Sequence, residues 1–174
     1  MSSLEKNNLT PTSEFQENLN ILRQSYFFSG LPLETLKIFA YLCTREKYRA
    51  GEYIFRQDDD DGQAFYIVEG KTRLEREDNG VTTEMRYCEP GEFLGGLTLL
   101  GKTRRLFSLK TVADTICLVL NREKFVKTIE QFPDLLPKIC KEVVRSIDSW
   151  EENFLSDRPG KCGECINQLG VTLI

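Results

Sequence analysis

The stretch AFYIVEGKTRLEREDNGVTTEMRYC, Ala64 to Cys88, decides the fold of this chain. Its first half is rich in β-branched and aromatic residues, which favour strands. Asp-Asn-Gly follows at residues 78–80, and Asn-Gly is typical of the type I′ turn that closes a β-hairpin. The chain then returns with Thr83, Met85 and Tyr87 alternating against charged neighbours, so the stretch predicts paired antiparallel strands.

Further short strands flank this hairpin on both sides. They are predicted at residues 50–57 (AGEYIFRQ), 105–112 (RLFSLKTV) and 115–120 (TICLVL). About eight short strands between residues 47 and 120 indicate an eight-stranded antiparallel β-roll of the jelly-roll kind.

Helical patterns precede and follow the strands. Ser13 is a candidate cap for a first helix that extends to Tyr26, and residues 33–43 predict a second. Asn121 is a candidate cap for a helix that stops before Pro133, and residues 134–155 predict a longer one. The fold class is therefore α+β, with N-terminal helices, a β-roll and a long C-terminal helix.

The expected domain organisation is simple. We expect a flexible lead over residues 1–13, one domain over residues 14–156 and a tail over residues 157–174.

Composition narrows the function. The 174 residues include no histidine, which excludes His-based triads and His metal sites and makes an enzyme the least favoured class. The net charge of −4 argues against nucleic acid as the main partner. The polar N-terminus and the lack of long apolar runs predict a cytoplasmic protein that does not span a membrane and keeps its cysteines reduced.

Several motifs in order resemble the cyclic nucleotide-binding domains of catabolite-activator-type regulators, regulatory kinase subunits and gated channels. They are FFSGLPLETLKIFAYL (27–42), AGEYIFRQ (50–57), AFYIVEGKTRL (64–74) and VADTICLVLNREKFVKTI (112–129). The resemblance covers residues 27–154 and implies a non-enzymatic regulatory module. Members that bind DNA append a helix-turn-helix after the long helix, and the roughly twenty residues after Phe154 are too few for one, so we expect no direct DNA binding.

The segment FLGGLTLLGKTRRLFSL, Phe93 to Leu109, is similar to the family's phosphate cassette, Phe-Gly-Glu-Leu-Ala-Leu-Leu followed by Pro-Arg-Ala-Ala-Ser/Thr. In that family, backbone N–H groups and the arginine bind the phosphate. The resemblance implies these ligand-binding residues: Gly95, Gly96, Leu97, Thr98, Arg105, Leu106 and Ser108.

The cassette departs from the family pattern at two places. Gly96 stands where the family has the glutamate that binds the ribose 2′-hydroxyl, and such a bond contributes about 1.5–3 kcal/mol. We therefore expect weak or no binding of cAMP or cGMP. Gly96→Glu should raise the affinity if the lost hydrogen bond is the main defect, and should do nothing alone if Leu106 and Phe107 block the pocket. Leu106 and Phe107 replace two small residues and could fill the space of the sugar or base.

Two functions stay open at this point. The first is a sensor that binds a small anionic or nucleotide-like ligand, with no other cofactor, and it is favoured by Arg105 and Ser108. The second is a degenerate domain that binds no ligand and acts as a dimeric scaffold for an unidentified protein partner, and it is favoured by Leu106 and Phe107.

The long C-terminal helix carries a heptad pattern. Its members are Leu136, Cys140, Val143, Ile147, Trp150 and Phe154. The pattern predicts a homodimer whose interface includes Val143, Ile147, Trp150 and Phe154. The alternative is that the stripe packs on its own β-roll, as we expect of its first half.

Three polar clusters have simpler interpretations. Asp58 to Asp61 lack the spacing of a calcium loop, and we expect a solvated turn. Lys102, Arg104 and Arg105 either attract an anion or form a solvated basic loop. Cys162 and Cys165 form a CxxC without a second metal-binding pair, so we expect no metal site and an incidental pair rather than a redox centre.

Overall fold

The computed structural model describes residues 11–156, without the side chains of residues 11–12, 150–151 and 153–156. The expectations for residues 1–10, for the Cys162–Cys165 pair and for the side chains of Trp150 and Phe154 lie outside the described residues.

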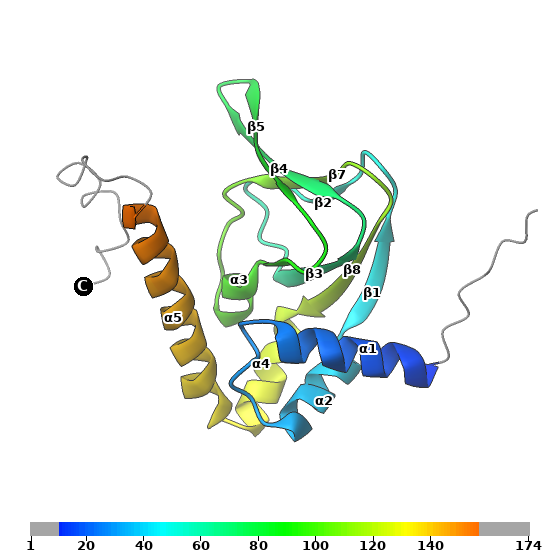
Figure 1. Cartoon of the computed structure of the whole chain (residues 1–174), viewed down its shortest axis with the longest axis vertical. Helices are drawn as coiled ribbons and strands as arrows, with labels where there is room; N and C mark the ends of the chain where they lie inside the picture. Colours follow the sequence, from blue (N-terminus) through cyan, green and yellow to red (C-terminus); the bar gives the residue numbers. More distant parts are fainter. Residues whose placement is uncertain (1–10, 157–174) are drawn as a thin grey trace, which may run out of the picture.

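The eight strands form two four-stranded antiparallel sheets, which confirms the predicted β-roll (Figure 1). One sheet has the order β1-β8-β3-β6 and the other the order β2-β7-β4-β5. The strands are β1 Thr44–Tyr48, β2 Tyr53–Phe55, β3 Gln63–Glu69, β4 Thr72–Asp78, β5 Val81–Cys88, β6 Phe93–Leu94, β7 Ser108–Thr111 and β8 Thr115–Asn121.

The interior between the sheets is apolar. Phe55 and Phe65 lie with ring centroids 5.6 Å apart, and Leu109 and Val119 pack with them from the two sheets. Leu109 lies between the half-buried Ser108 and Lys110, as a period-two pattern predicts. Val119 instead lies between two buried residues, because Leu118 and Leu120 on the opposite face of β8 pack into the helical cluster.

The predicted hairpin is confirmed. Asp78 pairs with Val81, and between them Asn79 and Gly80 have φ angles of 55° and 79°, as a type I′ turn requires. Beyond the turn, β5 is exposed along most of its length, and the hairpin projects from the roll (Figure 1).

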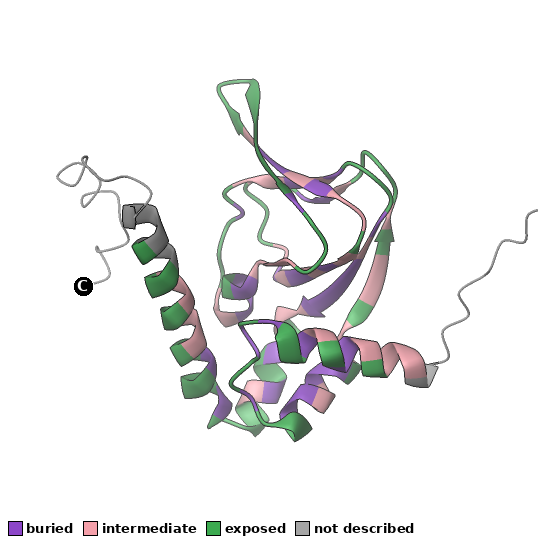
Figure 2. Cartoon of the chain, in the orientation of Figure 1, coloured by how far each residue is buried: buried purple, intermediate pink, exposed green. Residues whose placement is uncertain are grey.

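Four helices pack around a second apolar cluster below the roll (Figure 2). They are α1 Pro11–Gln24, α2 Leu33–Leu42, α4 Arg122–Gln131 and α5 Leu135–Ser156. Phe39 of α2 stacks on Phe125 of α4 with ring centroids 5.5 Å apart, and Phe28 packs on Phe39. The Asn121 cap is confirmed, because its side chain accepts a hydrogen bond from the backbone N–H of Glu123 at 2.7 Å.

The first helix differs from the prediction at both ends. It begins at Pro11, before the expected cap Ser13, and it ends at Gln24. Tyr26 therefore lies in a connector of consecutive turns rather than on the helix. The connector places the side chains of both Phe27 and Phe28 in the core. A continuing helix would separate two consecutive side chains by about 100° around its axis, so it could not bury both in the same way.

The inward face of α5 is rotated relative to the predicted heptad pattern. Leu135 and Ile139 are buried, whereas Leu136 and Cys140 are exposed. The expectation that the first half of the pattern packs on its own domain is wrong for Leu136 and Cys140, because the turn before α5 places Leu135 toward the core. Val143 is half-buried and packs against the helical cluster. No helix within residues 11–156 is both long enough and apolar enough to cross a membrane.

Candidate functional site

The cassette begins with a glycine that no other residue can replace. β6 leads into Gly95, which has φ 80°, and the short helix α3, Gly96–Leu100, follows. A Cβ at Gly95 would lie 2.5 Å from the Arg105 Nη1 and 2.9 Å from the Gln63 carbonyl oxygen. Both the left-handed backbone and the close approach require glycine here.

The second glycine, Gly96, is required by its aromatic neighbours. A Cβ at this position would lie 2.9 Å from the Phe27 ring and 3.0 Å from the Phe93 ring. These two rings also contact each other, with centroids 5.5 Å apart. A side chain at residue 96 would therefore point toward the aromatic cluster, and on this ground we expect Gly96→Glu not to form the ribose contact.

Arg105 is buried and held by one carboxylate. Its Nε donates to Asp61 Oδ2 at 3.0 Å and its Nη2 to Asp61 Oδ1 at 2.6 Å. The guanidinium also lies 4.0 Å from the Phe55 ring centroid. The side chain is 5% exposed, so this bidentate pair fixes its orientation inside the domain.

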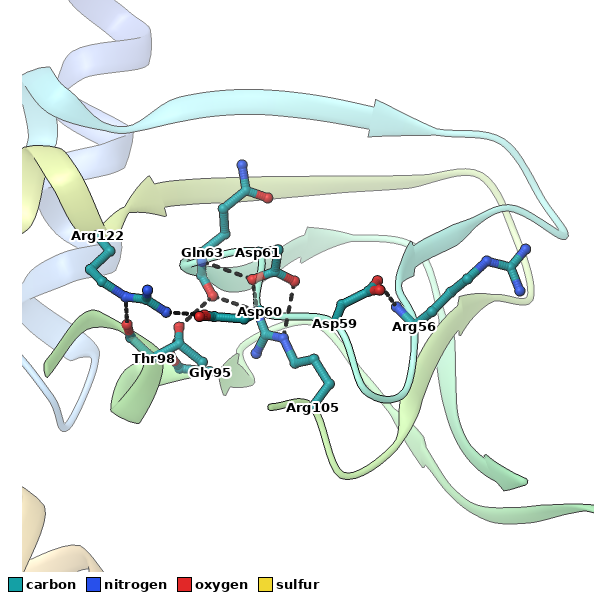
Figure 3. A network of polar contacts seen from close by, with 9 residues as sticks. All are labelled: Arg56, Asp59, Asp60, Asp61, Gln63, Gly95, Thr98, Arg105 and Arg122. Carbon is teal, nitrogen blue, oxygen red and sulfur yellow. Dashed lines mark hydrogen bonds and ion pairs between the residues drawn. The ribbon is translucent and has the colours of Figure 1, made fainter. Parts of the chain in front are cut away.

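Asp58, Asp59 and Asp60 are exposed, which agrees with the expected solvated turn, whereas Asp61 is half-buried; we name Asp58–Asp61 the acidic turn (Figure 3). Asp58 pairs with Arg104, Asp60 with Arg122 and Asp61 with Arg105. Asp59 accepts a hydrogen bond from the backbone N–H of Arg56. Arginines that lie far away in sequence thus engage the turn. Among the described residues no cluster could hold a metal ion.

The Gln63 carbonyl oxygen joins the acidic turn to the cassette (Figure 3). It accepts hydrogen bonds from Arg105 Nη2 at 2.6 Å and from the Thr98 hydroxyl at 2.8 Å. The Thr98 hydroxyl also contacts the Gly95 carbonyl oxygen at 2.7 Å. One backbone acceptor therefore ties β3, α3 and the segment after α3 together.

Arg122 extends the network to α4. It is the first residue of that helix, and its Nε donates to the Thr98 carbonyl oxygen while its Nη2 donates to Asp60. The hydrogen bond from Arg122 lowers the pKa of the Asp60 carboxyl. The acidic turn therefore contacts both the cassette arginine and the start of α4.

A hollow of about 580 Å³ lies beside the cassette, and we name it the cassette hollow. Its lining residues are Tyr26, Gly95, Gly96, Leu97, Thr98, Thr103, Arg104, Arg105, Leu106 and Phe107. Leu106 and Phe107 form part of its wall, so they leave space beside the cassette.

The hollow includes six of the seven ligand-binding residues expected from sequence, and Ser108 is the exception. Its hydroxyl accepts a hydrogen bond from the backbone N–H of Gln57 at 2.9 Å. Tyr26, Asp61 and Arg122 were not predicted from the sequence as parts of this site. The sequence signal for the ion pairs was the run of four aspartates together with the adjacent Arg104 and Arg105.

Three of the described thiols, those of Cys43, Cys88 and Cys117, are not activated as nucleophiles. Cys117 is buried and Cys43 is half-buried, and desolvation raises the pKa of each of these two thiols to about 12. Burial is also the main cause of the raised pKa of Cys88. These thiols stay protonated near neutral pH and pack as small apolar side chains.

Comparisons with known proteins agree with this fold. Residues 45–132 match the family model described as the cyclic nucleotide-binding domain. The chain is 35% identical over 114 residues to the cyclic AMP receptor protein of Thermus thermophilus, covering 64% of this chain and 52% of that protein. It is 27% identical over 170 residues to mouse cGMP-dependent protein kinase 2, covering 95% of this chain and 22% of the kinase.

A solved structure gives the same result. The cyclic nucleotide-binding-like protein of Brucella abortus is 27% identical, has a TM-score of 0.61, and is matched over 66% of this chain and 98% of that one. The chain spans about half or less of the two curated relatives named above. The family model, the eight-stranded roll and the cassette geometry lead to one conclusion: this chain belongs to the cyclic nucleotide-binding domain family.

Proposed function

We propose that this chain is a non-enzymatic regulatory module that binds a small anionic, nucleotide-like ligand in the cassette hollow. One observation carries the proposal. Asp61 and the Gln63 carbonyl occupy the Nε and Nη2 of Arg105, and the structure gives its Nη1 no hydrogen-bond partner among the described residues. That nitrogen lies against Gly95, where the hollow begins.

This arrangement suits an anion. Asp61 balances the buried charge and holds the guanidinium in one orientation, so a ligand phosphate would not need to order it. The remaining N–H groups of Nη1 can then donate a charge-assisted hydrogen bond to a phosphate oxygen. The names of the relatives, a cyclic AMP receptor protein and a cGMP-dependent kinase, suggest cyclic nucleotides as the first ligands to test.

Affinity is expected to be modest. Position 96 supplies no carboxylate for a ribose hydroxyl, and the wall of the hollow carries apolar side chains at Leu97 and Leu106. Binding energy must then come from the anion contact and from apolar contact with the rest of the ligand.

Calorimetric titration with cAMP, cGMP and inorganic phosphate tests the proposal. Removing one partner of a buried ion pair costs about 3–5 kcal/mol, so the informative variant removes both, Asp61→Asn with Arg105→Gln. We expect the wild type to bind at least one of the three and this double variant to lose that binding. The matched control is Glu123→Gln with Lys127→Gln, because that pair is exposed on α4 and does not line the hollow, and we expect it to bind like the wild type.

Absence of binding by the wild type to all three probes would refute the sensor. The alternative, a dimeric scaffold that binds no ligand, would then be favoured over the sensor. The exposed apolar side chains on α5 support this alternative. Leu136 is 41% exposed and Val144 is 64% exposed, and both lie on the same side of the helix with Cys140. We propose that this surface pairs with a second copy of the chain.

A further inference from the structure

An aromatic side chain from the N-terminal connector lines the cassette hollow. Tyr26 lies between α1 and α2, far from the cassette in sequence, and it shares the wall of the hollow with Leu97 and Leu106. Its neighbours in the connector, Phe27 and Phe28, are buried, whereas Tyr26 is 45% exposed. The connector thus fixes two rings in the core and leaves the third at the hollow.

Two edge contacts set the position of the Tyr26 ring. Its centroid lies 6.3 Å from that of Phe27 and 6.1 Å from that of Phe93, and both pairs are T-shaped. Phe27 and Phe93 are the same rings that press on the Gly96 backbone. Tyr26 is therefore held in a fixed place relative to the cassette, by the contacts that exclude a side chain at residue 96.

Tyr26 also contacts the long C-terminal helix. With Leu97 it lines a second hollow of about 250 Å³, whose other wall is Val143, Ser146 and Ile147 of α5. Burial raises the pKa of the Tyr26 phenol, and the Ser146 hydroxyl acts in the opposite direction. The ring thus separates the cassette hollow from α5.

We propose that Tyr26 is a ligand-binding residue of the cassette hollow, which favours anionic ligands with a planar heteroaromatic part because that part stacks on its ring. This inference rests on the proposed function and adds the recognition of a base to the recognition of a phosphate. An aromatic wall suits a planar base because every nucleobase has a π-face, and such stacking is sequence-tolerant. Arg105 then binds the anionic end and Tyr26 the aromatic end of one molecule.

The test compares a ligand with a base to a ligand without one. The full chain is titrated with whichever of cAMP and cGMP the wild type binds, and with ribose 5-phosphate. The variants are Tyr26→Phe, Tyr26→Leu and Tyr26→Ala, and the control is Tyr41→Ala, a tyrosine of α2 that is 81% exposed and does not line the hollow.

We expect Tyr26→Phe and Tyr41→Ala to bind the cyclic nucleotide like the wild type. Tyr26→Leu and Tyr26→Ala should lose about 5-fold to 100-fold in affinity for it, as removal of a stacking ring does. Ribose 5-phosphate should bind all variants alike. Tyr26→Leu keeps much of the apolar volume, so it remains informative if Tyr26→Ala does not fold.

Three results would overturn the inference. If Tyr26→Leu and Tyr26→Ala both bind the cyclic nucleotide like the wild type, Tyr26 does not bind the base. The proposed function would still stand in that case. An equal loss for the cyclic nucleotide and for ribose 5-phosphate would show that Tyr26 only supports the fold of the cassette. A wild type that binds none of the probes would overturn the proposed function and this inference together.

Discussion

At the scale of the residue, Gly96 shows how packing constrains a binding motif. Its Cα carries no side chain because the rings of Phe27 and Phe93 occupy the space that a Cβ needs. Phe27 is 1% exposed and cannot move aside without disturbing the core. The packing of Phe27 and Phe93 therefore explains why residue 96 carries no carboxylate, as much as the sequence of the cassette does.

Substitution of Gly96 should destabilise the fold. We expect Gly96→Ala to lower the free energy of unfolding by about 1–3 kcal/mol, as overpacking does, and Gly96→Glu to lower it further without improving cyclic-nucleotide binding. Urea denaturation and calorimetry measure the two effects.

The control for this prediction is Gly101→Ala. Gly101 has extended backbone, and a Cβ there meets no atom within 4 Å, so its substitution should be close to neutral. The prediction would be contradicted if Gly96→Glu were as stable as the wild type and bound cAMP more tightly. In that case the rings of Phe27 and Phe93 would have moved aside without a loss of stability.

At the scale of the element, the acidic turn connects parts of the domain that are distant in sequence. Its carboxylates pair with the cassette arginine and with the first residue of α4, and backbone hydrogen bonds join Asp58 and Asp59 to Arg105. The turn therefore holds the segment after α3 and the start of α4 against β3.

This turn should make the domain sensitive to acid. The pKa of Asp60 is lowered by its hydrogen bond with Arg122, so its contribution to stability is present above the unfolded pKa of about 3.9 and is lost as pH falls through the folded value. Urea denaturation from pH 5 to pH 2 should show a smaller loss of stability in Asp60→Asn than in the wild type.

Asp134→Asn is the control for the acid titration. Asp134 is exposed, and the structure gives it no ion-pair partner among the described residues. Arg76 lowers the pKa of Asp78, and Lys127 lowers the pKa of Glu123. Both pairs are present in both variants, so they contribute the same loss of stability with falling pH to each. Identical acid profiles for the wild type and Asp60→Asn would contradict the prediction.

At the scale of the whole molecule, α5 packs one face on its own domain and leaves another exposed. Leu135 and Ile139 are buried in the helical core, Val143 and Ile147 are half-buried beside Tyr26 and Leu97, and Val144 is exposed. The helix runs along the side of the molecule (Figure 1). Its outer face is thus available to a second copy of the chain.

Charging that face should prevent self-association. We expect the wild type to be a dimer and Val144→Glu to be a folded monomer in sedimentation equilibrium, because an unpaired carboxylate in an apolar seam is costly. Val81→Glu, an equally exposed position on the hairpin, should leave the dimer intact. A monomeric wild type at micromolar concentrations would exclude this surface as a dimer interface.

Local patterns in the sequence predicted local structure well. The Asn79-Gly80 turn, the Asn121 cap and the eight short strands depend on neighbouring residues, and the structure confirms them. The inward face of α5 was wrong by one residue, since Leu135 and Leu136 are equally apolar.

Contacts between distant segments could not be predicted in this way. Arg105 and Asp61 are separated by 44 positions, and no period in the sequence links them. Tyr26 fits a helical pattern yet lies in a turn beside the cassette, because the burial of Phe27 and Phe28 decides the path of the connector. Tertiary packing, rather than local propensity, determines these parts of the candidate site.

The contact between Gly96 and its two rings also bears on how a carboxylate could be engineered at residue 96. Gly96→Glu alone would place a Cβ 2.9 Å from the Phe27 ring and 3.0 Å from the Phe93 ring, so the substitution needs a second change that makes room for it. Shrinking Phe27 first would open a cavity in the core, at about 3–5 kcal/mol for a change as large as Phe→Ala. Each substitution is unfavourable without the other, so we expect Gly96→Glu and Phe27→Ala to show a coupling energy in a double-mutant cycle.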